Sequence, residues 1–144
     1  MRVRGLPYVV FIAALSALTS SCAASRVLQC NNLVEIANRA TAETEILTED
    51  QNNQDPLIWL QAADTLDKAA QEMQALSLDD PQLQQYQGGF VAMYTEIAKA
   101  TRDYSQSYKD LNREGVDVAK VKLEQAVQRE PDLVNGVNAY CVTR

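Results

Sequence analysis

Histidine is absent from the 144 residues, and this absence excludes many active sites. Ser-His-Asp and Cys-His nucleophilic systems, histidine-containing zinc sites, histidine-ligated haem and the Glu-x-x-His pairs of di-iron bundles all need imidazole. The glycine-rich nucleotide loops G-x-x-x-x-G-K-[ST] and G-x-G-x-x-G are missing as well. The acidic residues fall mainly on polar faces, where they are solvated and not arranged for acid–base work. We therefore predict a protein that is not an enzyme and has no cofactor and no metal site.

Long apolar runs and an excess of basic charge are also missing. The longest apolar run, Tyr8 to Leu18, has about 11 residues, whereas a membrane-spanning helix needs roughly 20. The chain has 13 basic and 19 acidic residues, and losing Arg2 and Arg4 with a leader takes its net charge from −6 to −8. Such a surface repels nucleic acid and anionic lipid. We expect no nucleic-acid partner, and membrane attachment only through an anchor.

The N-terminus has the layout of a secretory signal peptide. Arg2 and Arg4 form a short basic region, the apolar run follows, and the small polar residues 19–21 close the segment. This order predicts export, with residues 1–21 removed.

Within that segment LTSSC, residues 18–22, resembles the lipobox of bacterial lipoproteins. In that class the thiol of the cysteine, here Cys22, receives a diacylglycerol, and the peptide is cut before it. Thr19 stands where leucine, valine or isoleucine is more usual, so cleavage after Ala23 or Ala24 without a lipid is the alternative. The resemblance implies an exported, membrane-anchored lipoprotein that faces the periplasm or an equivalent compartment.

The body of the chain carries helix-start and helix-stop signals. The Asp-Pro steps at 55–56 and 80–81 each place a capping side chain before a proline at the first helical position. Residues 112–115, Asn-Arg-Glu-Gly, are typical of a helix end with a glycine just past it. The Glu-Pro-Asp step at 130–132 predicts a kink or a restart in the last helix.

Between these signals the apolar residues recur at helical spacing, and no segment alternates as a strand would. Steps of seven residues in four consecutive segments are typical of helices packed nearly in line. Short connections favour antiparallel neighbours, so we predict an all-α, antiparallel up-down four-helix bundle. It would occupy residues 27–144, after a short lipid-anchor tether at 22–26. The stripe positions are Cys30, Leu33, Ala37, Ala40, Thr44, Leu47; Trp59, Ala62, Leu66, Ala69, Met73, Leu76; Leu83, Phe90, Ile97, Tyr104, Leu111; and Val116, Ala119, Leu123, Ala126, Leu133, Val137, Tyr140.

Two further patterns lie inside the helices. Charged residues spaced four apart predict the ion pairs Glu35 with Arg39 and Asp64 with Lys68. The glycine pair at 88–89 weakens the third helix by about 1 kcal/mol per residue relative to alanine. It predicts a bend or a close helix contact, with a functional hinge as the alternative.

Cysteine parity and topology predict a disulfide. If Cys22 is acylated or removed, Cys30 and Cys141 remain as a pair in an oxidising compartment. In an up-down bundle the start of the first helix and the end of the fourth meet at one end. The pair lacks the C-x-x-C spacing of redox-active thiols, so we interpret it as a structural staple.

The opposite end of the bundle gathers acidic residues near a tryptophan. We expect these residues to be mainly solvated loop and capping charges, with a partner-facing tip as the functional alternative. No 12-residue calcium loop of the EF-hand type accompanies them. The tyrosines of the third helix (Tyr86, Tyr94, Tyr104, Tyr108) are expected in the core, although they would also suit a ligand slot. The tip comprises Glu49, Asp50, Asp55, Trp59, Glu114 and Asp117.

The segments CNNLVEIANRA, DPQLQQYQGGFVAMYTEIAKA and AYC resemble small helical lipoproteins of cyanobacteria and other Gram-negative bacteria. The resemblance implies a lipid-anchored helical protein and transfers no site. We expect a non-enzymatic interaction or accessory subunit at a membrane surface, with a protein partner. The alternative is a small-ligand-binding bundle of the exported space. A cavity with convergent polar groups would favour the alternative, and a filled core with an exposed apolar patch would favour the first.

Overall fold

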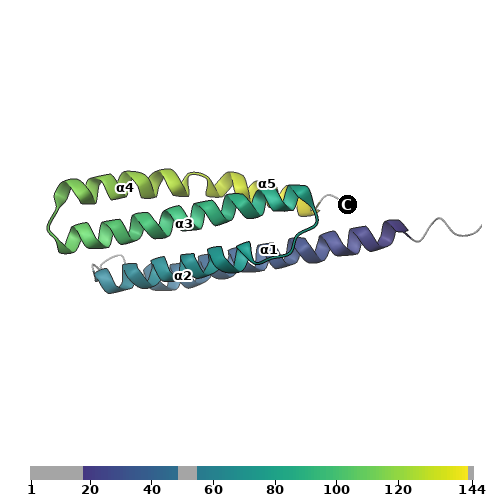
Figure 1. Ribbon diagram of the computed structural model, residues 1–144, viewed down its shortest axis with the longest axis horizontal. Coiled ribbons are helices and arrows are strands. Elements are labelled where there is room, and N and C mark those ends of the chain that lie inside the picture. Colours follow the sequence, from purple (N-terminus) through teal and green to yellow (C-terminus); the bar gives the residue numbers. More distant parts are fainter. Residues whose placement is uncertain (1–17, 49–54, 143–144) are drawn as a thin grey trace, which may run out of the picture.

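The computed structural model describes residues 18–48 and 55–142, the side chains of 18–24 and 48 excepted. Its helices are α1 (Leu18–Thr48), α2 (Pro56–Gln74), α3 (Pro81–Lys109), α4 (Arg113–Val127) and α5 (Glu130–Val142). α4 and α5 follow one another and together make the fourth arm of the bundle (Figure 1). Over the described ranges the chain has no strand. The predicted all-α, antiparallel four-helix bundle is confirmed.

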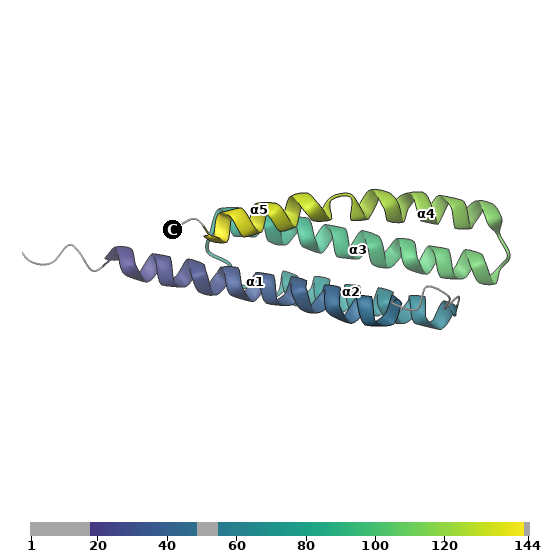
Figure 2. The same ribbon diagram turned by 180° about the vertical axis from the view of Figure 1, so that it is seen from behind.

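The arms form two layers, α1 with α2 and α3 with the α4–α5 arm (Figures 1 and 2). α2 and α3 pack extensively against each other and join the layers along one side. The α3–α4 turn lies at one end of the bundle, here called the distal end. The α2–α3 turn and the end of α5 lie at the other, here called the disulfide end (Figure 1).

Two of the predicted helix starts are confirmed. Asp55 caps α2 by accepting a hydrogen bond from the Leu57 amide at 2.9 Å, with a proline at the next position. Asp80 caps α3 by accepting from the amides of Gln82 and Leu83 at 2.9 and 3.1 Å. Each carboxylate satisfies backbone donors that have no partner within the helix.

The turn between α3 and α4 differs from the prediction. Asn112 was expected at a helix end but begins α4, where its side chain accepts from the Gly115 amide at 3.0 Å. Gly115 therefore lies in the first turn of α4, not past a helix end. Leu111, in the turn, has a left-handed backbone conformation with φ 54°. Its side chain is 89% exposed, so its predicted place on the core stripe is wrong. Asparagine suits both ends of a helix, which is why the pattern alone was misleading.

Ion pairs on the α1–α2 side differ from those expected. Arg39 pairs with Glu72 of α2, and Glu35 makes no ion pair with it. Lys68 also reaches Glu72, with Nζ 3.9 Å from Oε1. The long arginine side chain reaches the neighbouring helix, so the predicted pair Glu35–Arg39 is wrong.

Arg102 links α3 to α2 in the same way. Its guanidinium lies 2.7 Å from Asp64 and 2.5 Å from Asp67. Asp64 thus pairs with Arg102 of the neighbouring helix. The pair Asp64–Lys68, which the spacing of four residues predicted, is wrong. Contacts between helices depend on packing geometry, which spacing along one helix does not record.

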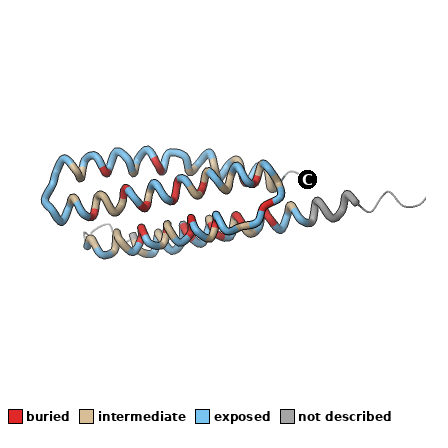
Figure 3. The backbone as a smooth tube through the Cα atoms, viewed as in Figure 1, coloured by how far each residue is buried: buried red, intermediate tan, exposed pale blue. Residues whose placement is uncertain are grey.

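The core is filled best in the disulfide half and the middle of the bundle. Buried positions face inward between the two layers (Figure 3). Large side chains close this region, and each methylene removed from water stabilises the fold by about 0.8 kcal/mol. The largest fully buried apolar residues are Phe90, Leu33, Met73, Leu83 and Met93.

The disulfide end is tied by covalent and polar contacts. The predicted disulfide is confirmed, with the Cα atoms of Cys30 and Cys141 5.9 Å apart. Gln29 accepts from the Asp79 amide at 2.8 Å, and the Tyr140 hydroxyl donates to Asp80 at 2.7 Å. The Tyr140 hydrogen bond is the main cause of the lowered pKa of Asp80. α1, the α2–α3 turn and α5 therefore meet as one connected end.

Glycines allow close approach between α3 and α5. α3 runs unbroken through Gly88 and Gly89. A Cβ on Gly89 would lie 2.5 Å from a Leu133 methyl, so this glycine marks the close helix contact that the pattern predicted. A Cβ on Gly136 would lie 2.7 Å from the Tyr86 ring, whereas one on Gly88 would meet nothing within 4 Å.

These environments predict opposite effects of the same substitution. Gly88→Ala is expected to raise the free energy of unfolding by about 0.5 to 1 kcal/mol, because alanine is the better helix former. Gly136→Ala is expected to lower it by about 1 to 2 kcal/mol, because the added methyl overpacks against an aromatic ring. Urea unfolding of the two variants measures the difference. Stabilisation by both would contradict the close contact between α3 and α5.

Candidate ligand-binding groove

A groove opens into the distal half of the bundle between all four arms. Its volume is about 470 Å³, and its walls are mostly apolar. Small-molecule sites in proteins usually measure about 300 to 1,000 Å³ and combine apolar walls with a few polar groups. The lining residues are Thr44, Trp59, Ala62, Leu66, Ile97, Thr101, Tyr104, Lys120, Leu123 and Val127.

The groove exists because the first and fourth arms pack on each other mainly at the disulfide end. There α5 contacts α1, and the disulfide joins them. α4 packs chiefly on α3 and leaves the side facing α1 open. The arm restarts at Glu130, as the following proline predicted, so its two halves pack on different neighbours. The break in the fourth arm thus separates a closed half from an open half.

Small side chains at inward positions provide the space. Thr44 lies on the same stripe of α1 as the buried Leu33, and Ala62 lies on the same stripe of α2 as Met73. The stripes that carry large residues in the disulfide half therefore carry small ones in the groove. This change in side-chain volume is visible in the sequence and was the signal that helical periodicity alone missed.

The polar atoms of the threonines are already used. The Thr44 hydroxyl donates to the Ala40 carbonyl at 2.7 Å, and the Thr101 hydroxyl donates to the Ile97 carbonyl at 2.8 Å. A hydroxyl bonded to its own helix offers a ligand little hydrogen bonding. The middle of the groove is therefore suited to apolar groups.

An aromatic cluster forms one wall. Trp59 was expected at the tip, and it lies half-buried with its ring edge-on to Tyr104 and Tyr108, at centroid distances of 4.8 and 5.2 Å. The other tyrosines of α3 divide between core and surface: Tyr94 is buried, and Tyr86 is half-buried against Tyr140. The expected core role holds for Tyr94 and for Tyr86, which packs against the core, while Tyr104 lines the groove and Tyr108 is exposed.

A smaller pocket of about 280 Å³ continues the groove toward α5. It shares Leu66 and Ile97 with the groove and adds the carboxylates of Glu45 and Glu130. Tyr94 also lines it, and burial, followed by the Glu130 carboxylate, raises the pKa of this phenol to about 12. This end of the groove is acidic.

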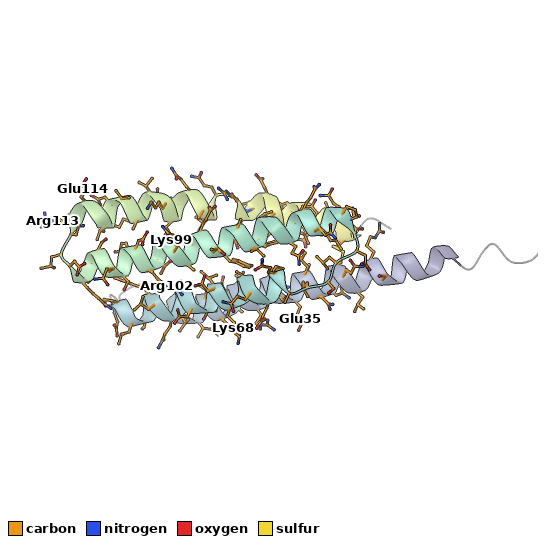
Figure 4. The ribbon with its side chains drawn as sticks, viewed as in Figure 1. Glu35, Lys68, Lys99, Arg102, Arg113 and Glu114 are labelled. Atoms are coloured by element: carbon orange, nitrogen blue, oxygen red, sulfur yellow. A yellow bond between two sulfur atoms is a disulfide. The ribbon has the colours of Figure 1, made fainter. Side chains whose placement is uncertain are left out.

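A shallow pocket of about 660 Å³ continues the groove to the α3–α4 turn. It shares Tyr104 and Lys120 with the groove and adds Arg113, which Figure 4 shows at the distal end of α4. Asp117 is the one carboxylate in its lining, and the exposed Leu111 forms part of its rim. This end of the groove therefore has more positive than negative side chains.

The residues predicted for the acidic tip have separate roles. Asp55 caps α2, Asp117 lines the shallow pocket, and Glu114 is exposed in the first turn of α4. Glu49 and Asp50 lie outside the described residues. Among the side chains that the structure describes, no three metal-ligating groups come together.

Exposed apolar side chains near the distal end are a feature that the sequence reasoning missed. Ile46 is 74% exposed, Leu57 61% and Leu111 89%. Ile46 and Leu57 lie near helix ends and off the predicted stripes, whereas Leu111 was predicted to face inward and follows the end of α3. Within the described ranges, no helix is both long and apolar enough to cross a membrane.

The chain matches no protein-family model, no curated protein and no solved structure. The groove and its charges therefore carry the functional argument.

Proposed function

We propose that this chain is a non-enzymatic, lipid-anchored, exported bundle that binds a small apolar ligand in the groove of its distal half. The observation that carries the proposal is the groove of about 470 Å³, whose walls are mostly apolar and partly aromatic. Protein interiors are normally close-packed, and an unfilled core forfeits both buried area and dispersion contacts. A ligand between α1 and α4 would restore both.

Export and anchoring are supported by the sequence of residues 18–22 and by the cysteine pair. Cys30 and Cys141 form a disulfide. Disulfides persist in oxidising, exported compartments, so this bond supports export. α1 is helical from Leu18 onward, so the backbone positions of Cys22 and Cys30 lie about 12 Å apart along the helix axis. An acyl chain on Cys22 would hold the disulfide end beside the bilayer, with the groove farther from it.

Trp59 provides the test, because it is the single tryptophan and it lines the groove. We expect a bound apolar ligand to change its emission saturably at one ligand per chain. The melting temperature should rise with ligand concentration, since the ligand binds only the folded state. Lipids and apolar small molecules extracted from the native envelope form the library. Unchanged Trp59 emission and an unchanged melting temperature across the library would contradict the proposal.

The second candidate function is an interaction or accessory subunit at a membrane surface. Exposed Ile46, Leu57 and Leu111 favour it, because apolar groups gathered at one end often mark a protein-binding site. Copurification from gently solubilised membranes distinguishes the two functions. A stoichiometric protein partner supports the accessory role, whereas a copurifying small molecule supports the ligand-binding role.

A further inference from the structure

We propose that the ligand is an aliphatic chain with an anionic head group, bound with its head at Lys120 and its chain along the seam between α1 and α4. This inference rests on the proposed ligand-binding function and names the chemical class of the ligand. It follows from the charges at the two ends of the groove, the apolar middle and the direction of the seam.

Among the described residues, no carboxylate neutralises the cations at the distal end of the groove. Lys120 and Arg113 make no ion pair within 4.0 Å in the described part of the chain, whereas Arg39, Arg102 and Arg129 each pair with a carboxylate on another helix. The Lys120 ammonium lies 6.0 Å from the centre of the Tyr104 ring, at the junction of the groove with the shallow pocket. A carboxylate, sulfate or phosphate at this junction would lie beside Lys120. Arg113 supplies a second cation about two helical turns away on α4.

The other end has the opposite charge. Glu45 and Glu130 line the pocket toward α5, and no basic side chain lines it. An anionic head at that end would meet two like charges, which disfavours the reversed orientation. The charge difference along the groove therefore favours one direction of binding for an anionic amphiphile.

The middle of the groove fits an alkyl chain. Leu66, Ile97 and Leu123 line it, and the threonine hydroxyls beside them are bonded to their own helices. From Lys120 to Val127 the seam follows about 10 Å of α4, and the acidic pocket extends it toward α5. An elongated, flexible chain fills such a seam better than a compact ring system.

The aromatic cluster does not favour a cationic head. Quaternary ammonium sites need an open cage of rings around the cation. The Trp59 ring contacts Tyr104 and Tyr108 edge to face, with centroids 4.8 and 5.2 Å apart, and the two tyrosine rings stack at 6.4 Å, so the three rings leave no open cage. The Lys120 ammonium already lies near the Tyr104 face, where it would repel a second cation.

The test compares three probes with the same alkyl chain: dodecanoate, dodecanol and dodecyltrimethylammonium, each below its micelle concentration. Trp59 emission and the melting temperature of the full mature protein report binding. We expect dodecanoate to bind about fivefold more tightly than dodecanol, the effect of one partly exposed ion pair, and the cationic probe to bind most weakly.

Lys120→Gln should remove the preference for dodecanoate over dodecanol, measured as the ratio of the two affinities. Lys109→Gln is the matched control, because Lys109 is an exposed cation near the same end that does not line the groove. Equal binding of the three probes, or an unchanged preference in Lys120→Gln, would overturn the head-group assignment and leave groove binding in place. If no probe binds, the assignment falls, and a negative result with the envelope library would remove the proposed function as well.

Discussion

The double variant Cys30→Ala/Cys141→Ala is expected to lose up to about 4 to 5 kcal/mol of unfolding free energy. The two cysteines are separated by 111 positions, so the disulfide closes nearly the whole described chain into one loop. In the loop-entropy model, stabilisation grows with loop length because the cross-link restricts the unfolded chain. This change would remove much of the margin of a single domain, which is typically about 5 to 15 kcal/mol.

Denaturant unfolding of the variant and of the wild-type protein, each with and without reductant, measures the effect. Reduced wild-type protein should match the oxidised double variant, and reductant should not change the variant further. Stability within about 1 kcal/mol of the oxidised wild type would show that local contacts, including Tyr140 with Asp80, hold this end without the disulfide.

The disulfide also limits how far the groove can open. It joins α1 to α5 at the end away from the groove, so the first and fourth arms cannot separate there. At the distal end, α4 packs on α3 and the side facing α1 stays open. Without the disulfide, only the short apolar contact between α1 and α5 would hold the disulfide end together. One closed end and one open end give a seam of defined width, which preorganises the site for an elongated ligand.

Features that depend on local chemistry could be predicted from the sequence. Asp55 and Asp80 cap helices because an aspartate before a proline offers both an acceptor and a preset backbone angle. The Cys30–Cys141 pair followed from parity and from an up-down topology, which brings the chain ends together.

Features that depend on the relative placement of arms could not be predicted. Arg39 and Arg102 pair with carboxylates of a neighbouring helix, and their partners depend on the rotation of each arm about its axis. Leu111 lies on the heptad pattern of α3, yet the helix ends before it and leaves it exposed. The groove arises where Thr44 and Ala62 face α4, which packs chiefly on α3, a consequence of three-dimensional packing and not of periodicity.

Thr44→Phe is expected to weaken ligand binding by at least about thirtyfold, because the ring and the ligand would occupy the same space. Thr44 lines both the groove and the acidic pocket, so a large side chain there blocks the seam near its middle. Filling an apolar cavity commonly raises stability by about 0.5 to 2 kcal/mol, so the variant should fold and melt at or above the wild-type temperature. Loss of binding would then follow from a blocked site and not from unfolding.

Titration of Trp59 emission with dodecanoate, together with the melting temperature of each variant, measures both effects. Asn38→Phe is the matched control, because it adds the same ring to an exposed position of α1 that lines no part of the groove. Thr44→Ala tests the opposite change: it enlarges the groove and should leave dodecanoate binding within about threefold of wild type. If Thr44→Phe folds and still binds dodecanoate as wild type does, the alkyl chain lies outside the seam between α1 and α4, and the distal end with Ile46 and Leu57 becomes the surface to test.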